Sequence, residues 1–528
     1  MKRLIFTSLI CCIAIYFTSA QSLYRQTYKF GKILEYIDSY YVDSVDIINL
    51  TEEAIKTVLT DLDPHSTYLT KEEVYKNREN LQGSFEGIGI SFNILKDTLF
   101  VITPISGGPS EKVGILAGDR IIKVDGENIA GVGITNEDVF RLLKGKKGTE
   151  VVVTVLRRKV KAPLDFTIIR DRIPIFSIDA SYMINANTGY IKLNRFAQTT
   201  SYEFSQAAGK LKEQNAENLI LDLTGNGGGY LDKAIDLADE FLKKGRLIVY
   251  TEGVKSPRRE SYATTRGSFE TGNIIVLIDE GSASASEIVS GAIQDWDRGI
   301  IIGRRSFGKG LVQRPLSLPD SSELRLTVAK YYTPSGRLIQ KPYDNGNSDY
   351  ERDLIERYYN GEMMNRDSIQ LSKDKKKYTM VKKRPVYGGG GIMPDIFVPL
   401  DTLGYSDYYR DLIRTGILNR FVLNYVDKNR ADFKAKYPEF SGFNADYNID
   451  NALLEELYAY AEKEDLKKNP EDIAKSEKHL RNLMKAYIAR DLWQTSEFYE
   501  VINQLDSNVS KAVEVMNNWE HYKSIILN

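Results

Sequence analysis

The fold class predicted for this 528-residue chain is multidomain α/β, with a β-rich module ahead of an α/β core and helical segments at both ends. Three observations predict it. The length exceeds what one hydrophobic core usually supports, so the chain should divide into several domains. Between residues 173 and 400, buried strand patterns alternate with helical ones, as in α/β folds. Short strands separated by glycines precede this region, and charged amphipathic helices follow it.

The N-terminal segment, residues 1–20, has the three parts of a secretory signal peptide. Two basic residues follow Met1, an apolar run covers 4–17, and small residues occupy 18–20. The apolar run is short for a membrane-spanning helix. The pattern predicts export, with the bacterial periplasm as the expected compartment and association with the membrane left open.

Both cysteines of the chain, Cys11 and Cys12, lie inside this segment. The mature protein would therefore hold no disulfide, no thiolate nucleophile and no cysteine-ligated metal. Lipid attachment to one of these cysteines is the weaker alternative, because neither follows the small residues that usually precede a lipidated cysteine.

The charge of the chain excludes one class of function. The formal net charge is -1, whereas a nucleic-acid binder that works by electrostatics needs a basic stripe or a strongly basic domain. We therefore expect no nucleic-acid partner. Nothing in the sequence implies a metal ion or an organic cofactor.

Two regions precede the core. Residues 21–84 show helical periodicity and form a predicted N-terminal helical segment. Residues 85–172 form a predicted compact β-rich module, in which several short strands accompany a single late helix. Its strand patterns lie at 87–92, 99–103, 120–124 and 150–156, and its helix at 136–143.

The predicted core covers residues 173–400, and a charged helical extension covers 401–528. In the core, short continuous apolar runs indicate buried strands, and longer amphipathic stretches indicate helices. The strand patterns lie at 219–223, 247–250, 274–278 and 300–302, and the helical patterns at 231–242 and 285–296. For the extension, two interpretations stay open: it packs on the core, or it makes a contact between copies of the chain.

Ser284 and Lys309 are the candidate catalytic pair. Ser284 stands where a buried strand pattern gives way to a helix, a position that exposes a serine hydroxyl. The chain has only three histidines, and none lies in the central region, so a Ser-His-Asp triad is not expected unless a distant histidine folds inward. A Ser-Lys pair is the natural substitute. The alternative is structural, because Glu287 completes a capping box with Ser284. The histidines are His65, His479 and His521.

A lysine that acts as a general base must lose its proton at working pH. From a reference pKa near 10.4, this costs roughly 4 to 5 kcal/mol at pH 7, and burial must supply that shift. We therefore expect Lys309 to lie under apolar side chains, with Phe307 and Leu311 as candidates. Gln313, four residues on, could accept a hydrogen bond from the lysine and hold it toward the serine. Without these contacts, Lys309 is an ordinary surface lysine and Gln313 an ordinary strand residue.

A glycine-rich turn at 225–229 follows another buried strand pattern and precedes a helix. A phosphate-binding loop is not expected, because the Lys-Ser/Thr pair is missing and the glycine spacing is not GxGxxG. Backbone N-H groups of this turn, together with that of Ala285, could form an oxyanion hole. The alternative is a tight turn without a ligand.

These motifs together resemble the C-terminal processing peptidases, also called tail-specific proteases. They occur in the order that the family has and cover residues from about 25 to 400. The motifs lie at 62–69, 87–90, 108–126, 222–229, 282–288, 306–313, 331–337 and 391–396.

The resemblance implies a ββα-type core of the ClpP and crotonase kind, with a PDZ domain over 85–172. It implies a serine endopeptidase in which Ser284 is the nucleophile, Lys309 the base and Gln313 the residue that orients Lys309. The oxyanion donors would be Gly228 and Ala285. The expected partners are protein substrates with exposed C-termini, bound through backbone N-H groups of Gly87, Ile88, Gly89 and Ile90.

Two features depart from the family pattern. Relatives usually carry Arg and Pro where this chain has Thr224 and Gly227, so the oxyanion donor of the turn is less defined. Residues after 400 extend beyond the shared core.

Other functions also stay open: a catalytically inactive PDZ scaffold or chaperone, or a hydratase-like or amidase reaction on a small acyl compound. Self-association is left open.

Overall fold

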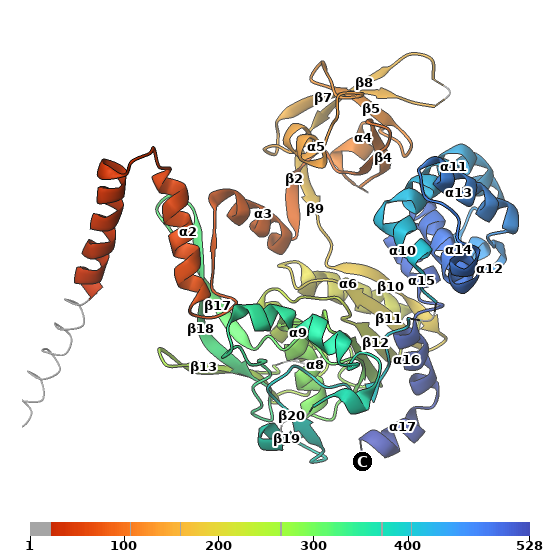
Figure 1. The fold of residues 1–528 in the computed structure, drawn as a ribbon. Helices are drawn as coiled ribbons and strands as arrows, with labels where there is room; N and C mark the ends of the chain where they lie inside the picture. The colour runs from red at the N-terminus through yellow and green to blue at the C-terminus, as the bar shows by residue number, and fades with distance from the viewer. Residues whose placement is uncertain are drawn as a thin grey trace, which may run out of the picture. The chain divides into compact units, whose positions relative to one another are not determined.

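The computed structural model describes residues 23–105, 107–158, 160–264, 267–370, 373–402 and 404–527. The predicted signal peptide, with Cys11 and Cys12, lies outside the described residues. The chain divides into two compact units, and each is described by itself (Figure 1). One comprises Met1–Lys71 and Gln313–Thr327, and the other Glu72–Val312 and Val328–Asn528.

The first unit combines N-terminal helices with part of a β-hairpin. A helix covers 23–40. The next helix, α2 (Ile47–Thr60), begins at Asp46, whose carboxylate accepts the N-H groups of Ile48 and Asn49 and so satisfies free donors of the first turn. Strand β1 (Thr67–Leu69) pairs antiparallel with the first residues of β18. The hairpin strands β17 (Leu311–Ser317) and β18 (Glu323–Tyr332) pair with each other and continue into the second unit.

The second unit begins with α3 (Lys71–Gln82) and a β-rich module. Strands β2 and β9 pair antiparallel where the chain enters and leaves the module. Between them, a sheet in the order β3-β4-β5-β7-β8 surrounds its own apolar core, which includes Leu99, Val101, Ile121 and Val153. The elements are β2 (Ser84–Gly87), β3 (Ile90–Ile94), β4 (Leu99–Pro104), α4 (Pro109–Lys112), β5 (Arg120–Val124), β6 (Glu127–Asn128), α5 (Asn136–Leu143), β7 (Glu150–Leu156), β8 (Leu164–Ile169) and β9 (Asp171–Pro174).

The α/β core is built on a six-stranded sheet in the order β10-β11-β12-β15-β16-β21. All neighbouring pairs are parallel except β10 with β11. Parallel strands buried on both faces read as continuous apolar runs, as in the Ile274–Ile278 strand. The strands are β10 (Ile178–Asn185), β11 (Thr188–Leu193), β12 (Asn218–Asp222), β15 (Ile274–Ile278), β16 (Ile300–Gly303) and β21 (Ile396–Phe397).

Alternate residues of these strands enter two different cores. On one face, Leu219 and Leu221 pack with helices α6 (Thr200–Glu213), α7 (Leu231–Asp239) and α8 (Ala285–Asp295). On the other face, Ile220 packs with the C-terminal helices α16 (Ser507–Asn517) and α17 (Trp519–Ile526). The sheet is therefore the middle layer of three.

Two regions complete the second unit. After β18, the chain forms α9, short 3-10 turns and the hairpin β19-β20, while β13 pairs with β14 and with the end of β18. Helices α10–α15 then enclose a separate aromatic-rich core. The elements are β13 (Leu247–Gly253), β14 (Ser256–Tyr262), α9 (Asn347–Tyr359), η1 (Arg366–Ser368), η2 (Lys373–Lys375), β19 (Lys376–Tyr378), β20 (Pro385–Tyr387), α10 (Asp407–Arg414), α11 (Ile417–Lys436), α12 (Phe440–Asp446), α13 (Asn451–Lys463), α14 (Pro470–Leu492) and α15 (Thr495–Ile502).

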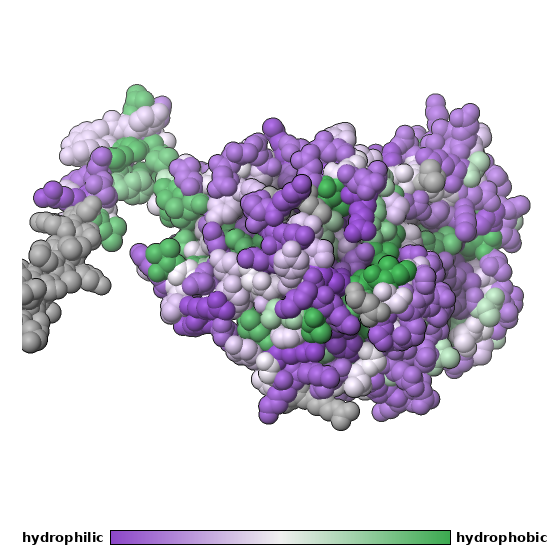
Figure 2. Space-filling model, turned by 90° about the horizontal axis from the view of Figure 1, so that it is seen from below, coloured by the Kyte–Doolittle hydropathy of each residue, from purple (hydrophilic) through white to green (hydrophobic). Residues whose placement is uncertain are grey.

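The surface carries both apolar and polar areas (Figure 2). Among the described residues, none of the helices is both long enough and apolar enough to span a bilayer.

Candidate active site

Ser284 stands at the turn between strand β15 and helix α8. Its backbone has φ 54° and ψ -110°, in the positive-φ region that residues with a side chain rarely adopt. Such strain at a strand-to-helix turn is typical of nucleophilic serines, because it directs the side chain away from the sheet. The residue is half-buried, and the next residue, Ala285, is buried as the first residue of α8.

Glu287 joins the backbone of Ser284 to the loop that carries Lys309. One carboxylate oxygen accepts the N-H groups of Ser284 at 2.8 Å and of Lys309 at 2.9 Å. The other accepts the N-H of Gly308 at 2.8 Å and the hydroxyl of Ser306 at 2.5 Å. Because backbone N-H groups of both candidate residues bind one oxygen, Glu287 fixes the separation of the two chain segments.

The side chain of Glu287 is fully buried. Burial raises its pKa to about 7, and the four donors oppose that shift because they favour the ionised form. A buried carboxylate whose donors come from two loops can therefore change charge near neutral pH.

Tyr331 makes a second link between the same two segments. Its buried hydroxyl shares its one proton between two carbonyls, that of Ser284 at 3.0 Å and that of Lys309. Burial raises the pKa of Tyr331 well above its usual value, so the hydroxyl keeps its proton. The two segments are thus tied through their N-H groups and through their carbonyls.

Lys309 lies in the loop between β16 and β17 and is half-buried. Of the two side chains expected to cover it, Leu311 is buried, and the ring of Phe307 lies 4.2 Å from the ammonium group of Lys341. The N-H of Gly310, the residue after Lys309, donates to the side-chain oxygen of Gln340 at 2.8 Å. The loop is held on both sides of Lys309.

Gly228 lies directly against the candidate nucleophile. It has φ 101°, and a Cβ at this position would stand 2.9 Å from the Ser284 Cβ and 3.0 Å from the Ala285 nitrogen. Only glycine fits this approach. The N-H of Gly228 donates to the side-chain oxygen of Asn226 at 2.9 Å, so this predicted oxyanion donor is engaged within its own turn.

Asn226 also fastens the glycine turn to the serine loop. Its carbonyl accepts the N-H of Ala283 at 3.0 Å and the hydroxyl of Ser286 at 2.8 Å. Its side-chain nitrogen donates to the carbonyl of Leu193 at 2.9 Å. The turn and the N-terminus of α8 are therefore one hydrogen-bonded assembly.

Gln313 belongs to the other compact unit. There its side-chain nitrogen donates to Thr327 Oγ1 at 3.2 Å, and that hydroxyl donates to Asp63 at 3.0 Å. Asp63 also accepts the N-H groups of His65 and Ser66, which explains the motif at 62–69 as a turn built around one carboxylate. The predicted hydrogen bond from Lys309 to Gln313 stays a prediction.

The predicted peptide-binding segment of the β-rich module joins β2 to β3. Gly87 ends β2, and Ile90 begins β3. Between them Gly89 has φ 74°, and the carbonyls of Ile88 and Gly89 accept the N-H groups of Ser110 and Ile105. Strand β3 lies at the edge of its sheet with β4 as its neighbour, so its other edge presents backbone groups to an added strand.

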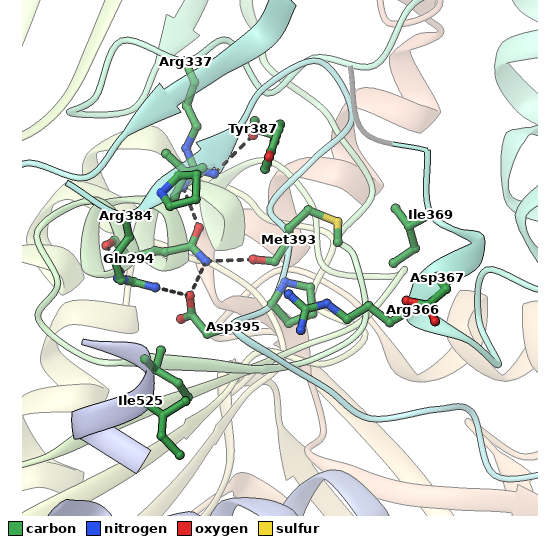
Figure 3. A pocket seen from close by; sticks show the side chains of 14 residues that line it. Gln294, Arg337, Arg366, Asp367, Ile369, Arg384, Tyr387, Met393, Asp395 and Ile525 are labelled. Carbon is green, nitrogen blue, oxygen red and sulfur yellow. Dashed lines mark hydrogen bonds and ion pairs between the residues drawn. The ribbon is translucent and has the colours of Figure 1, made fainter. Parts of the chain in front are cut away.

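A pocket of about 640 Å³ lies at the other end of α8. Figure 3 shows that its polar side chains bind one another: Gln294 accepts from Arg337 at 2.7 Å and donates to the Met393 carbonyl and to Asp395. Neither Ser284 nor Lys309 lines it. In the described part of the chain, no cluster of potential metal ligands occurs.

The sequence did not identify every residue of this site. Glu287 was expected only as a helix cap, and Tyr331 was not singled out as a site residue. The spacing of Ser284 and Glu287 predicts the bond to the Ser284 N-H, which the structure contains. The contacts with residues 306–309 come from a distant segment, and no spacing rule reports them.

Three family models match this chain. Residues 187–346 match peptidase family S41, residues 100–157 match the PDZ domain, and residues 408–494 match a family of unknown function, DUF8443.

Curated relatives match over a longer part of the chain. It is 41% identical to the carboxy-terminal-processing protease of Bartonella bacilliformis over 61% of this chain and 74% of that protein. It is 37% identical to the carboxy-terminal processing protease CtpA of Bacillus subtilis over 59% of this chain and 66% of that protein. Among solved structures, the photosystem II D1 C-terminal processing protease is 28% identical, with a TM-score of 0.33 over 59% of this chain and 89% of that chain. The chain therefore belongs to the carboxy-terminal processing proteases of peptidase family S41, a serine-type family, and carries a PDZ domain.

Proposed function

We propose that this protein is an exported serine endopeptidase that binds the C-terminus of a protein substrate through its PDZ domain and cleaves the chain with a Ser284-Lys309 dyad. Gln313 orients Lys309 in this proposal, and Gly228 and Ala285 stabilise the oxyanion. Family membership supports the reaction class.

The observation that carries the assignment of the pair is the shared attachment of Ser284 and Lys309 to Glu287. Two loops that lie 25 residues apart are held by one buried carboxylate and by the Tyr331 hydroxyl. A serine that only capped a helix, or a lysine in a solvent-exposed turn, would not require this connection.

The proposed reaction has two halves. Ser284 Oγ attacks the scissile carbonyl while Lys309 Nζ takes its proton, and the same amine then protonates the leaving peptide nitrogen. Water next attacks the acyl-enzyme, with Lys309 accepting and returning a proton in the same way. The negative oxygen forms near the N-terminus of α8, which favours negative charge, and within reach of the Ala285 N-H. Gly228 contributes its N-H by exchanging the Asn226 oxygen for the substrate oxygen.

Substrate selection is proposed to occur at strand β3. An extended peptide would add to its free edge, and the terminal carboxylate would bind N-H groups of the Gly87-Ile90 segment. The carbonyls of Ile88 and Gly89 are already used inside the domain, so the proposed contact with the substrate carboxylate falls to N-H groups. Export remains a prediction from residues 1–20.

A scaffold or chaperone with an inactive core is the second candidate. It would bind C-terminal peptides without cleaving them. A third, an acyl-transfer enzyme for small compounds, would cleave no protein.

One experiment separates these candidates. Purified wild type, Ser284→Ala and Lys309→Ala are incubated with a protein that has an unstructured apolar C-terminus, and products are read by mass spectrometry. Both variants should lose at least about 1,000-fold in rate while still binding C-terminal peptides. Ser290→Ala, a substitution further along α8, serves as the matched control and should stay active. Full cleavage by Ser284→Ala would rule out the dyad, and peptide binding without cleavage by wild type would favour the scaffold.

A further inference from the structure

A buried lysine lies behind the glycine turn. Lys192, on β11, is 7% exposed, and its ammonium group contacts three oxygens. It binds the Asp222 carboxylate at 2.9 Å, the Thr224 carbonyl at 2.7 Å and the Thr224 hydroxyl at 2.6 Å. All three donors of the ammonium group are thus used.

The partners of Lys192 form a closed network at the end of β12. Asp222 accepts the hydroxyl of Tyr190 at 2.6 Å on one oxygen, and the N-H and hydroxyl of Thr224 on the other. The Thr224 hydroxyl therefore donates to Asp222 and accepts from Lys192. The carboxylate of Asp506, at the start of α16, also lies in the field of Lys192 and Asp222. Lys192 is the cation that pairs with the buried Asp222 carboxylate.

This network stands where the glycine turn begins. Thr224 is followed by Gly225, Gly228 and Gly229, all with positive φ. Glycines have no side chains with which to anchor a turn, and their backbone is the least restricted of any residue. The path to Gly228 is therefore fixed by three anchors: Lys192 at Thr224, Asp279, which accepts the Gly225 N-H at 2.8 Å, and the Asn226 contacts described above.

A small displacement of this turn would reach the nucleophile. Gly228 approaches Ser284 so closely that no Cβ fits between them. Releasing Thr224 would let the Gly228 N-H move relative to Ser284, and a shift of about 1 Å in such a group costs on the order of 100-fold in rate.

We propose that Lys192 is a positioning residue for the oxyanion turn: by binding Thr224 and Asp222, it sets where Gly228 stands against Ser284. The inference rests on the proposed function, because it assigns Gly228 to the oxyanion hole. The proposal also assigns a role to Thr224. It accepts the hydrogen bonds through which Lys192, on the neighbouring strand, holds the turn.

The test is a double-mutant cycle of Lys192→Met and Thr224→Val. Methionine keeps the length of the lysine chain without its charge, and valine keeps the shape of threonine without its hydroxyl. Peptide cleavage gives kcat and KM, melting gives the thermal midpoint, and a fluorophosphonate gives the rate at which Ser284 is phosphonylated with loss of fluoride. Lys485→Met is the matched control, since Lys485 is 9% exposed and donates to a backbone carbonyl within the helical extension.

Lys192→Met should lower kcat by about 10- to 100-fold with KM nearly unchanged, and should slow phosphonylation by a similar factor. The double variant should lose little more than Lys192→Met alone, because the contact that Thr224→Val removes is one of the three that Lys192→Met already removes. Lys485→Met should keep its kcat at temperatures where it is folded. A Lys192→Met enzyme with kcat within twofold of wild type would overturn the proposal, as would strictly additive losses.

Two checks keep the outcome decisive. If Lys192→Met does not fold, Lys192→Gln carries the test, because glutamine removes the charge and keeps polar atoms at the site, and a folded Lys192→Gln enzyme with full kcat overturns the role. The proposed function is tested beforehand by the loss of cleavage in Ser284→Ala. An active, Ser284-dependent wild type with an unaffected Lys192→Met variant would contradict only the positioning role.

Discussion

At the scale of single residues, Glu287 holds the two loops of the candidate site together. It binds donors from two loops, and its pKa of about 7 lies well above its usual value of 4.5 because burial disfavours its charge. Below pH 4.5 the carboxyl is neutral in both the folded and the unfolded chain. Between pH 4.5 and 7 only the unfolded chain releases the proton, so the contribution of this group to folding stability falls as pH rises.

The free energy of unfolding should therefore show a Glu287-dependent loss between about pH 4.5 and pH 7. From the shift, the loss is about 3 kcal/mol. Denaturant unfolding of wild type and Glu287→Gln at several pH values measures this loss. Glutamine cannot ionise, so the variant lacks this part of the pH dependence of the free energy of unfolding. Parallel pH profiles for the two proteins would contradict the assignment.

Gly228→Ala tests the close approach of the turn to Ser284. The added Cβ would meet Ser284 Cβ and the Ala283 carbonyl at 2.9 Å, in a backbone conformation that alanine rarely adopts. We expect kcat to fall by about 100-fold or more. Gly227→Ala is the matched comparison, since a Cβ at that position would have nothing within 4 Å, and its loss in kcat should be much smaller. Equal kcat values for the two variants would argue against Gly228 at the oxyanion position.

Residue-scale prediction from the sequence succeeded where a local pattern encodes the contact. The capping spacing identified the bond between Glu287 and the Ser284 N-H. Tyr331 and Lys192 were not recognised, because each acts on a partner more than 20 residues away and each resembles an ordinary strand residue.

At the scale of elements, strand β3 is the edge of the PDZ domain at which we propose that a peptide adds. Its apolar side chains continue toward helix α5, where the rings of Phe92 and Phe140 lie 5.7 Å apart in an edge-to-face contact. Phe140 remains 48% exposed, which leaves apolar surface beside the free strand edge.

Amidation of a substrate peptide should weaken its binding to the PDZ domain. The amide removes the charge that the N-H groups of residues 87–90 would bind, and a charge-assisted hydrogen bond contributes about 1.5 to 3 kcal/mol. Fluorescence anisotropy with free and amidated forms of one peptide should therefore show at least a tenfold difference in Kd. Equal Kd values would exclude carboxylate recognition.

Helix and strand types followed the sequence patterns, while their ends depended on packing. Helix α5 covers the predicted 136–143. The helix predicted over 231–242 ends at Asp239 in the structure, and the one predicted over 285–296 ends at Asp295. After α7 ends, the chain turns so that Phe241 and Leu242 are buried in the core. The helical periodicity of the sequence continues past this turn and does not predict it.

At the scale of the whole molecule, the last two helices of the C-terminal extension are part of the core that contains the central sheet. Helices α16 and α17 cover one face of the central sheet, where Ile220, Ile275 and Leu277 are fully buried. Of the two interpretations left open by the sequence, packing on the core describes these helices. The sequence does not distinguish these two interpretations, because an apolar helix face has the same residue pattern whether it packs on a sheet or on another copy of the chain.

A charge placed in this layer should destabilise the whole core. Val515→Asp puts an unpaired carboxyl on the buried face of α16, at a cost of roughly 3 kcal/mol or more. Scanning calorimetry should show a clearly lower melting midpoint. Asn517→Asp, which adds the same charge at an exposed position of α16, should leave the midpoint nearly unchanged. Equal midpoints for both variants would show that α16 does not stabilise the sheet.

The central claim is that Ser284 is the nucleophile and Lys309 the base that activates it. Labelling with a fluorophosphonate, followed by peptide mapping, tests this claim most directly. We predict one phosphonyl group on the peptide that contains Ser284, formed in wild type and in Ser290→Ala, and at least about 100-fold slower in Lys309→Ala. A label on another serine, or equal labelling rates with and without Lys309, would contradict the account.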